Sequence, residues 1–414
     1  MKRFWIALVP IFLIGLLASC STTRVLLQTA PTKPKGMLAS PPLPLSTLEN
    51  WQQSDVRQIR ALLENTIYGT YPSALTLERI DQRLLETPRF DGSAMITLET
   101  LRIRNPATGV SRDFGLVIAR PVDAPGDVPV IMMENFCPNT AVIPVPEVPK
   151  PQGDFMSCDG HGMLSGVFTY FFGRYISTPP IAMIMRHGYA LASVFPSEFI
   201  PDTAEGGVKA LDQFFADQPA ATRTHAIMAW AAEYSLLSHY LKTSEGFSKT
   251  IAYGHSRFAK AALVAGAFDP TIDAVVAHQS GTGGASLSRD KTGEGLDSIS
   301  ENYPHWFLPK FATYEDNKAA LPLDQHFLLA LMAPRPMFLG NARRDVWSDP
   351  NGAFRAAQAA SAAYRLYGQE GLRQQTLKDY DPTADIAFWL RPGTHGVVKE
   401  DWPAFLEFLD AHFK

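Results

Sequence analysis

The stretch Thr250-Ile251-Ala252-Tyr253-Gly254-His255-Ser256-Arg257-Phe258-Ala259-Lys260 decides the fold that we predict. An apolar strand runs into Gly254-His255-Ser256 and continues directly as a helix. This order is typical of a nucleophile elbow, a sharp strand-to-helix turn that exposes a serine, with Ala259 in place of the motif's second glycine. The helix N-terminus behind Ser256 would offer positive potential and backbone N–H groups to a developing oxyanion. The same residues also fit a helix N-cap serine in an ordinary loop.

Short apolar runs alternate with amphipathic stretches along the rest of the chain. This alternation predicts an α/β fold of the α/β-hydrolase type, with a mostly parallel sheet covered by helices on both faces. Such sheets place their chemistry just past the carboxyl ends of the strands. We expect strands over residues 128–134, 189–195, 250–253, 272–277, 336–340 and 387–390, and helices over 225–241, 257–267, 325–332, 353–367 and 401–413.

Two later loops supply partners for Ser256. Asp345 follows the predicted strand 336–340, and His395 lies on the glycine-flanked loop between the predicted strand 387–390 and the last helix. The order serine, acid, histidine is that of the α/β-hydrolases. A base that takes the serine proton and a carboxylate that orients the base are what a serine hydrolase needs. We therefore predict Ser256, His395 and Asp345 as catalytic residues, with Asp349 as the reserve acid, although Asp349-Pro350 also reads as a turn or cap.

Composition excludes several classes of protein. The chain has 414 residues, 46% hydrophobic and 19% charged, which is enough for one large α/β domain or for two or three small ones. A net charge of −4 argues against a nucleic-acid-binding protein. Three cysteines cannot build a four-cysteine zinc site, and Cys158-Asp159-Gly160-His161 lacks a second ligand pair. We expect no metal and no cofactor.

The N-terminus reads as an export signal. Lys2 and Arg3 precede an apolar run over residues 4–17, which is too short to span a bilayer and ends in Leu17-Ala18-Ser19-Cys20. The ending resembles a lipobox, so residues 1–19 are predicted as a lipoprotein signal peptide and Cys20 as the lipidated residue. An ordinary signal peptide with an incidental cysteine is the alternative. Ser21 would then favour the outer membrane of a Gram-negative cell, on its periplasmic side.

The same reasoning divides the chain into three parts. Residues 20–50, rich in Pro, Ser, Thr and Leu, are predicted as a tether, and residues 51–414 as the folded domain. The membrane would be contacted only through the lipid anchor. Export would permit a disulfide between Cys137 and Cys158, but two ordinary buried thiols are the favoured interpretation.

With these residues in hand, the chain resembles the glucuronoyl esterases, carbohydrate esterase family 15, over roughly residues 125 to 412. Several separate segments in the right order carry the resemblance, which makes it far more specific than one serine motif. They are Asn135-Phe136-Cys137-Pro138-Asn139, the 254–260 stretch, Gln279-Ser280-Gly281-Thr282-Gly283-Gly284-Ala285, Pro304-His305-Trp306-Phe307, Leu321-Pro322-Leu323-Asp324-Gln325-His326, Ala333-Pro334-Arg335-Pro336, Asp345-Val346-Trp347-Ser348-Asp349-Pro350 and Gly393-Thr394-His395.

Two positions depart from the family pattern. Fungal members carry their catalytic glutamate where this chain has Gln279, and an amide cannot offset the charge of an imidazolium. The resemblance includes bacterial relatives that use an acid after the later strand, which favours Asp345 here. The second departure is Cys137-Pro138 in place of glycines in the oxyanion-side loop, where Pro138 removes one backbone donor.

The resemblance also implies roles in binding. Arg257 would offer its backbone N–H and guanidinium to the oxyanion, Lys260 would bind hydroxyls of the uronic acid ring, and Trp347 would stack on or wall the sugar. Read without the resemblance, Arg257 and Lys260 are an exposed basic helix start and Trp347 is a core aromatic. Gln279 is included with the substrate-binding residues.

The resemblance implies hydrolysis of (4-O-methyl-)glucuronoyl esters, such as those joining glucuronoxylan side chains to lignin alcohols, so the expected partner is a polysaccharide or oligosaccharide carrying such esters. Two alternatives stay open at this point. One is an exported esterase of the same fold with another carbohydrate ester as substrate, for example an acetyl ester. The other is a non-catalytic lipoprotein that binds carbohydrate on a hydrolase scaffold.

Overall fold

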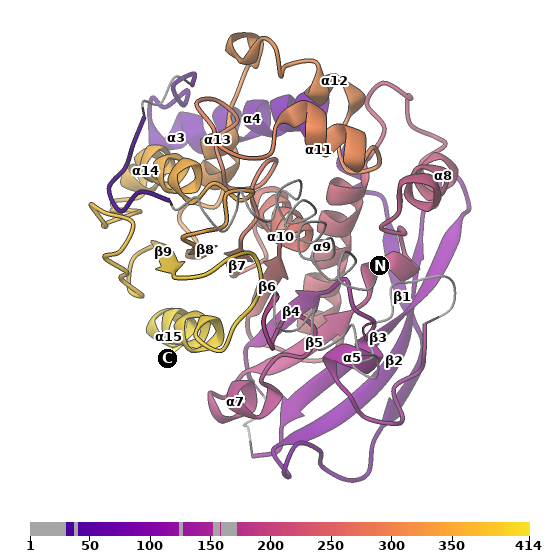
Figure 1. The fold of residues 1–414 in the computed structure, drawn as a ribbon. Helices are drawn as coiled ribbons and strands as arrows, with labels where there is room; N and C mark the ends of the chain where they lie inside the picture. Colours follow the sequence, from indigo (N-terminus) through magenta and orange to yellow (C-terminus); the bar gives the residue numbers. More distant parts are fainter. Residues whose placement is uncertain (1–29, 37–39, 124–126, 152–157, 159–171) are drawn as a thin grey trace, which may run out of the picture.

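A nine-stranded sheet forms the centre of the molecule (Figure 1). The computed structural model describes residues 30–36, 40–123, 127–151, 158 and 172–414. The strand order is β1-β2-β3-β5-β4-β6-β7-β8-β9. The strands from β5 to β9 in this order run parallel, whereas β1, β2 and β3 form antiparallel pairs that join the sheet through β5.

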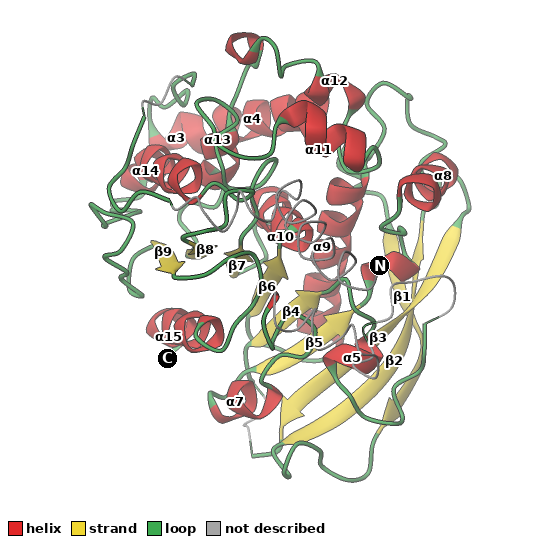
Figure 2. Cartoon of the chain, viewed as in Figure 1, coloured by secondary structure: helices red, strands yellow, loops and turns green. Residues whose placement is uncertain are grey.

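The six parallel strands are those expected from the apolar runs, with shifted ends. They are β4 (Val130–Glu134), β5 (Ala190–Val194), β6 (Thr250–His255), β7 (Ala274–His278), β8 (Met337–Ala342) and β9 (Ile386–Arg391). Helices connect them, as Figure 2 shows, and five of these match predicted ones: α9 (Ala226–Ser244), α10 (Arg257–Phe268), α13 (Gln325–Ala330), α14 (Pro350–Leu366) and α15 (Asp401–Phe413). The predicted α/β-hydrolase architecture is confirmed by this parallel core and its helical layers.

Three strands were not anticipated: β1 (Thr76–Leu84), β2 (Ala94–Arg104) and β3 (Ser111–Pro121). β1 is mostly exposed, β2 mixes apolar and polar residues, and β3 contains the apolar run Leu116-Val117-Ile118-Ala119, which the prediction did not use. In β2 the even-numbered Ile96 and Leu98 are buried on one face, and Leu101 and Ile103 on the other. A search for continuous apolar runs passes over β1 and β2, and a search for a period of two would find β2.

Two hydrophobic clusters pack on opposite faces of the sheet. Neighbouring residues of one strand divide between them, because side chains of a strand alternate in direction. In β4, Val130 and Met132 join the larger cluster, which contains residues of α9, α10, α13 and α14. Ile131 and Met133 join the second cluster, which contains residues of α15 and of α7 (Ile181–Arg186). Helices therefore pack on both faces of the parallel strands and bury them.

The described part of residues 20–50 lies against the domain. Ala30 donates its N–H to Arg343 O at 2.5 Å, and Leu377 N donates to Thr32 O at 2.9 Å. His326 Nε2 lies 3.0 Å from Pro41 O. This differs from the prediction of a tether that extends to residue 50, since the chain is packed on the domain from Ala30 to residue 36 and again from residue 40. The predicted signal peptide and Cys20 lie outside the described residues.

Two buried acids lie between the sheet and α9. Glu134 ends β4 and Glu233 lies on α9, and none of their carboxyl oxygens has a hydrogen-bond partner within the described residues. Burial, with the charge of Glu198 adding to it, raises the pKa of Glu233 to about 8. Burial and the charge of Glu233 also raise the pKa of Glu134 well above its ordinary value. Both side chains are therefore protonated in the folded protein at mildly acidic pH.

These acids make stability depend on pH. The unfolded chain loses the Glu233 proton above about pH 4.3, whereas the folded chain holds it to a higher pH, so stability falls as pH rises from about 4.5 to 8. The variant Glu233→Gln does not titrate. We expect its Tm relative to the unsubstituted protein to rise steadily between pH 5 and pH 8 in a thermal melt. The exposed Glu407→Gln on α15 is the control, and a Glu233→Gln offset that is the same at every pH would contradict the account.

Candidate active site

Ser256 sits on a strained turn between β6 and α10. Its backbone has φ 57° and ψ −118°, a conformation that L-residues adopt rarely and that marks functional sites. A Cβ on Gly254 would lie 2.2 Å from the backbone of Phe258, so only glycine lets the strand approach the helix this closely. Ser256 N donates to His278 O at 2.9 Å, which fixes the turn to the end of β7. The N–H of Arg257, the first residue of α10, has no acceptor within the helix.

His395 and Asp345 are brought together by the loops that follow β9 and β8. His395 Nδ1 lies 2.7 Å from Asp345 Oδ2, and Ser348 N donates to Asp345 Oδ1 at 3.2 Å. Asp345 is fully buried, and His395 retains about 15% exposure. Burial opposes ionisation of Asp345, but the charge of His395 and the hydrogen bonds from His395 and Ser348 outweigh it, so the pKa of Asp345 lies below its ordinary value.

The residue that precedes Ser256 in the chain contacts this pair. The ring of His255 lies 4.6 Å from the ring of His395. Burial, followed by the charges of His395 and His278, lowers the pKa of His255 well below its ordinary value, so His255 is neutral. Within the described residues the hydroxyl of Ser256 forms no hydrogen bond. Trp347, half-buried, stands edge-on to His395 at 6.0 Å and walls one side of its ring.

Gln279 holds the backbone on both sides of His395. Its Nε2 donates to Thr394 O at 3.1 Å, and its Oε1 accepts from Gly396 N at 2.7 Å. Its Oε1 also lies 3.0 Å from Nε2 of the neutral His255. This double contact needs both a donor and an acceptor, which an amide has and an ionised carboxylate does not. Gln279 was predicted among the substrate-binding residues, and in the structure its side chain contacts the loop that carries His395.

A second cluster surrounds Arg257. Its guanidinium pairs with Asp202 and lies 4.8 Å from the ring centroid of Trp306. Asp202 also accepts from Trp306 Nε1 at 3.0 Å. Burial opposes its ionisation, but the charge of Arg257 and the hydrogen bonds around it lower its pKa. Asp202 was not anticipated, because it stands in a polar stretch after β5 with no motif around it.

Lys260 lies one helical turn after Ser256 and is buried. Its ammonium donates to Ser280 O and lies 5.6 Å from the ring centroid of Trp306. Burial lowers the pKa of Lys260 to about 8, while the nearby carboxylate of Glu294 acts in the opposite direction. Lys260 is therefore not an exposed residue at the start of a helix, because its buried ammonium contacts Ser280 O and the ring of Trp306.

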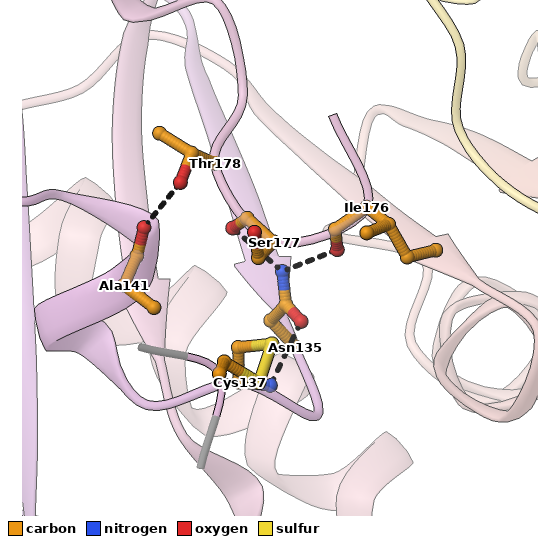
Figure 3. Close-up of a disulfide and its surroundings, with 7 residues drawn as sticks. Asn135, Cys137, Ala141, Ile176, Ser177 and Thr178 are labelled. Carbon is orange, nitrogen blue, oxygen red and sulfur yellow. Dashed lines mark hydrogen bonds between the residues drawn. A yellow bond between two sulfur atoms is a disulfide. The ribbon is translucent and has the colours of Figure 1, made fainter. Parts of the chain in front are cut away.

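Cys137 and Cys158 form a disulfide, with their Cα atoms 5.6 Å apart. The favoured prediction of two separate thiols is thus wrong, because the spacing in the chain gave no measure of their distance in space. Figure 3 shows the bridge beside Asn135, whose Oδ1 accepts from Cys137 N at 2.9 Å and whose Nδ2 reaches Ser177 O at 3.3 Å. The parallel register of β4 and β6 places this loop beside the serine turn. Cys137 N–H is thereby engaged, and Pro138 has none to offer.

The reserve acid has a structural place. Asp349 has φ 45°, caps α14 and accepts from Gly352 N at 3.1 Å. This is the cap that its position before Pro350 suggested. Within the part of the chain that the structure describes, no three His, Cys, Asp or Glu side chains are placed to hold a metal ion. His161 lies outside that part. In the same described ranges no helix is long and apolar enough to cross a membrane.

Comparison with known proteins identifies sequence relatives. A family model described as "Glucuronyl esterase, fungi" matches residues 176–368. A carbohydrate esterase from an unknown prokaryotic organism is 30% identical over 377 residues, which cover 89% of this chain and 86% of that protein. A 4-O-methyl-glucuronoyl methylesterase of Wolfiporia cocos is 31% identical over 156 residues, 34% of this chain and 38% of that protein.

Solved structures are also similar. A promiscuous CE15 esterase from a marine bacterial metagenome superposes with a TM-score of 0.78 at 28% identity, covering 92% of this chain and 98% of that one. A glucuronoyl esterase from Solibacter usitatus gives a TM-score of 0.76 at 28% identity, covering 92% and 99%. These similarities extend over nearly the whole of both chains.

The geometry predicts which acid serves His395. Asp345→Asn should lower kcat by about a thousandfold or more, because an amide cannot stabilise the imidazolium or fix its tautomer. Gln279→Ala should lower kcat by a smaller factor, since it loosens the His395 loop without removing charge. The measurement is kcat for ester hydrolysis by each folded variant.

The double variant Asp345→Asn/Gln279→Glu is the decisive control. A glutamate at 279 loses the donor to Thr394 O and should not restore activity to the Asp345→Asn protein. Recovery to near the unsubstituted rate, or equal losses for Asp345→Asn and Gln279→Ala, would contradict the assignment of Asp345.

Proposed function

We propose that this chain, which belongs to the glucuronoyl esterase family (carbohydrate esterase family 15), hydrolyses (4-O-methyl-)glucuronoyl esters of glucuronoxylan type as a serine esterase. The observation that carries the proposal is the 2.7 Å contact of His395 Nδ1 with buried Asp345. Ser256, on a strained strand-to-helix turn after β6, supports the same proposal. Family membership supplies the substrate class, and these side chains supply the chemistry.

The proposed reaction begins with attack of Ser256 Oγ on the ester carbonyl, while His395 Nε2 takes the serine proton. Asp345 accepts from His395 Nδ1 and stabilises the imidazolium that forms. The Arg257 N–H at the start of α10 faces the developing oxyanion. Collapse expels the alcohol, which receives its proton from His395 and leaves a glucuronoyl ester of Ser256. Water, deprotonated by the same histidine, then releases glucuronate and free Ser256.

Three side chains around the serine are suited to hold the uronic acid. Lys260 presents an ammonium whose remaining hydrogens can donate to ring hydroxyls, and Trp347 offers an aromatic wall beside His395. The guanidinium of Arg257 is positioned by Asp202. Gln279 acts as a positioning residue for the His395 loop in this proposal, and does not bind sugar.

Export and anchoring belong to the same proposal. The Cys137–Cys158 disulfide supports an oxidising compartment, as disulfides are rare in reducing ones. Signal cleavage before Cys20, lipidation of Cys20 and an outer-membrane position remain our proposal from the sequence, with the anchor as the membrane contact. Mass measurement of the N-terminal peptide from cell membranes would test the lipid.

Hydrolysis of benzyl glucuronate tests the function. We expect serine-dependent cleavage with kcat/KM at least about tenfold above that for p-nitrophenyl acetate, because the sugar contacts contribute binding energy that the acetate lacks. Ser256→Ala should abolish both. Cleavage of the acetate alone would indicate an esterase whose substrate is another ester. No cleavage of either ester by a folded protein would favour carbohydrate binding without catalysis.

The pKa of Lys260 predicts how substrate binding depends on pH. As pH rises through about 8, Lys260 loses its proton and one donor to the sugar, so KM for benzyl glucuronate should rise above pH 8. Lys260→Met should have a raised KM that no longer changes between pH 7 and pH 9. KM for p-nitrophenyl acetate is the control and should stay flat. The same rise above pH 8 in Lys260→Met would exclude Lys260 as its source.

A further inference from the structure

A basic pocket lies beside the loops that carry the proposed acid and base. Its volume is about 300 Å³, and its walls come from the carboxyl ends of β8 and β9 and from Lys378. The two walls are tied together by backbone hydrogen bonds, Arg343 N to Arg391 O and Arg344 N to Gly393 O, both 2.8 Å. Arg344 immediately precedes Asp345, and Gly393 lies two residues before His395.

Every ionisable side chain that lines this pocket is basic. Arg391 is buried and neutralised by Asp401, whose Oδ1 lies 2.9 Å from its Nε. Arg343, Arg344 and Lys378 form no ion pair with any part of the chain that the structure describes, and Arg343 Nε donates only to Ala30 O at 3.3 Å. The whole chain carries a net charge of −4, so this local positive excess runs against the overall charge.

Such an arrangement favours an anion of small-molecule size. Unpaired cations repel one another, and a concave wall concentrates their field on whatever enters it. A volume of about 300 Å³ is at the lower end of the range for small-molecule sites and suits a single charged sugar residue. A flat lipid surface would contact an exposed patch more readily than the walls of a pocket. Arg344 and Arg343 can bind a carboxylate through paired N–H donors.

We propose that this pocket is a second, non-catalytic site that binds the carboxylate of a free hexuronic acid. The inference rests on the proposed function, which makes glucuronate both the product of each cleavage and a side group of the polymer. Binding of an unesterified side group there would hold an acidic polysaccharide beside Ser256 while a neighbouring ester is cleaved. The site contributes affinity for the polymer and takes no part in the chemistry.

Removing the two charges tests the pocket. The pair Arg344→Gln/Lys378→Gln is made in the full-length protein and compared with Arg57→Gln/Lys209→Gln, which removes two exposed, unpaired charges on α4 (Val56–Leu63) and α8 (Ala204–Phe214). Retention on glucuronoxylan is measured by affinity electrophoresis in a Ser256→Ala background. We expect the pocket pair to weaken retention by about fivefold at low salt, and the control pair to leave it unchanged. Neutral arabinoxylan should show no difference.

Two further measurements distinguish free glucuronate from the polymer as the source of the carboxylate, and distinguish failure of the pocket proposal from failure of the proposed function. If released product occupies the pocket, titration with free glucuronate should show one binding step fewer in the pocket variant than in the control pair. If only the retention on glucuronoxylan weakens, the site binds the polymer. Either result supports the proposed site. The proposal would be overturned if the control pair weakened retention on glucuronoxylan as much as the pocket pair, or if the pocket pair did not weaken it. It would also be overturned if the pocket pair changed only the binding of the protein to phosphatidylglycerol vesicles. Benzyl glucuronate cleavage by the Ser256 protein reports on the proposed function separately and should be equal in both pairs.

Discussion

The hydrogen bond between Asp345 and His395 is the contact on which the rest of the site depends. A buried carboxylate without a partner would be costly, and the charge of His395 together with the N–H of Ser348 offsets that cost. The two residues come from different strands, so the contact exists only when β8 and β9 are side by side in register. The sheet thus brings the two side chains together, because its parallel strands end at the same edge.

Beside this contact, Gln279 places an amide next to the loop that carries His395. Gln279 hydrogen-bonds the backbone before and after His395, so this side chain positions the loop and supplies no charge. The physical requirement for a triad is one carboxylate at Nδ1 of the histidine, and Asp345 meets it. A second carboxylate at 279 would face the carbonyl oxygen of Thr394 and repel it. In this structure the carboxylate at His395 Nδ1 is that of Asp345.

Sequence patterns predicted the parallel core because buried strands are apolar runs and their motifs stand on the loops that follow them. They also placed Ser256, Asp345 and His395 on three such loops. They missed β1 and β2, whose residues form no continuous apolar run, and also β3, although it contains a short run. They missed Asp202 as well, whose partner Arg257 lies 55 positions away. The disulfide was left as the less favoured alternative for the same reason, since the distance in space between Cys137 and Cys158 is set by tertiary packing. The contacts of Gln279 depend on backbone atoms, which carry no signal in the sequence.

The most direct test of the account is covalent labelling with an alkyl fluorophosphonate, followed by mass mapping of the modified peptide. The account predicts one modification, on Ser256, at a rate that Asp345→Asn lowers by about a hundredfold or more, because the serine proton must pass to an oriented His395. Gln279→Glu should leave the site of modification the same. Modification of another residue, or an unchanged rate in Asp345→Asn, would contradict the proposed arrangement of Ser256, His395 and Asp345.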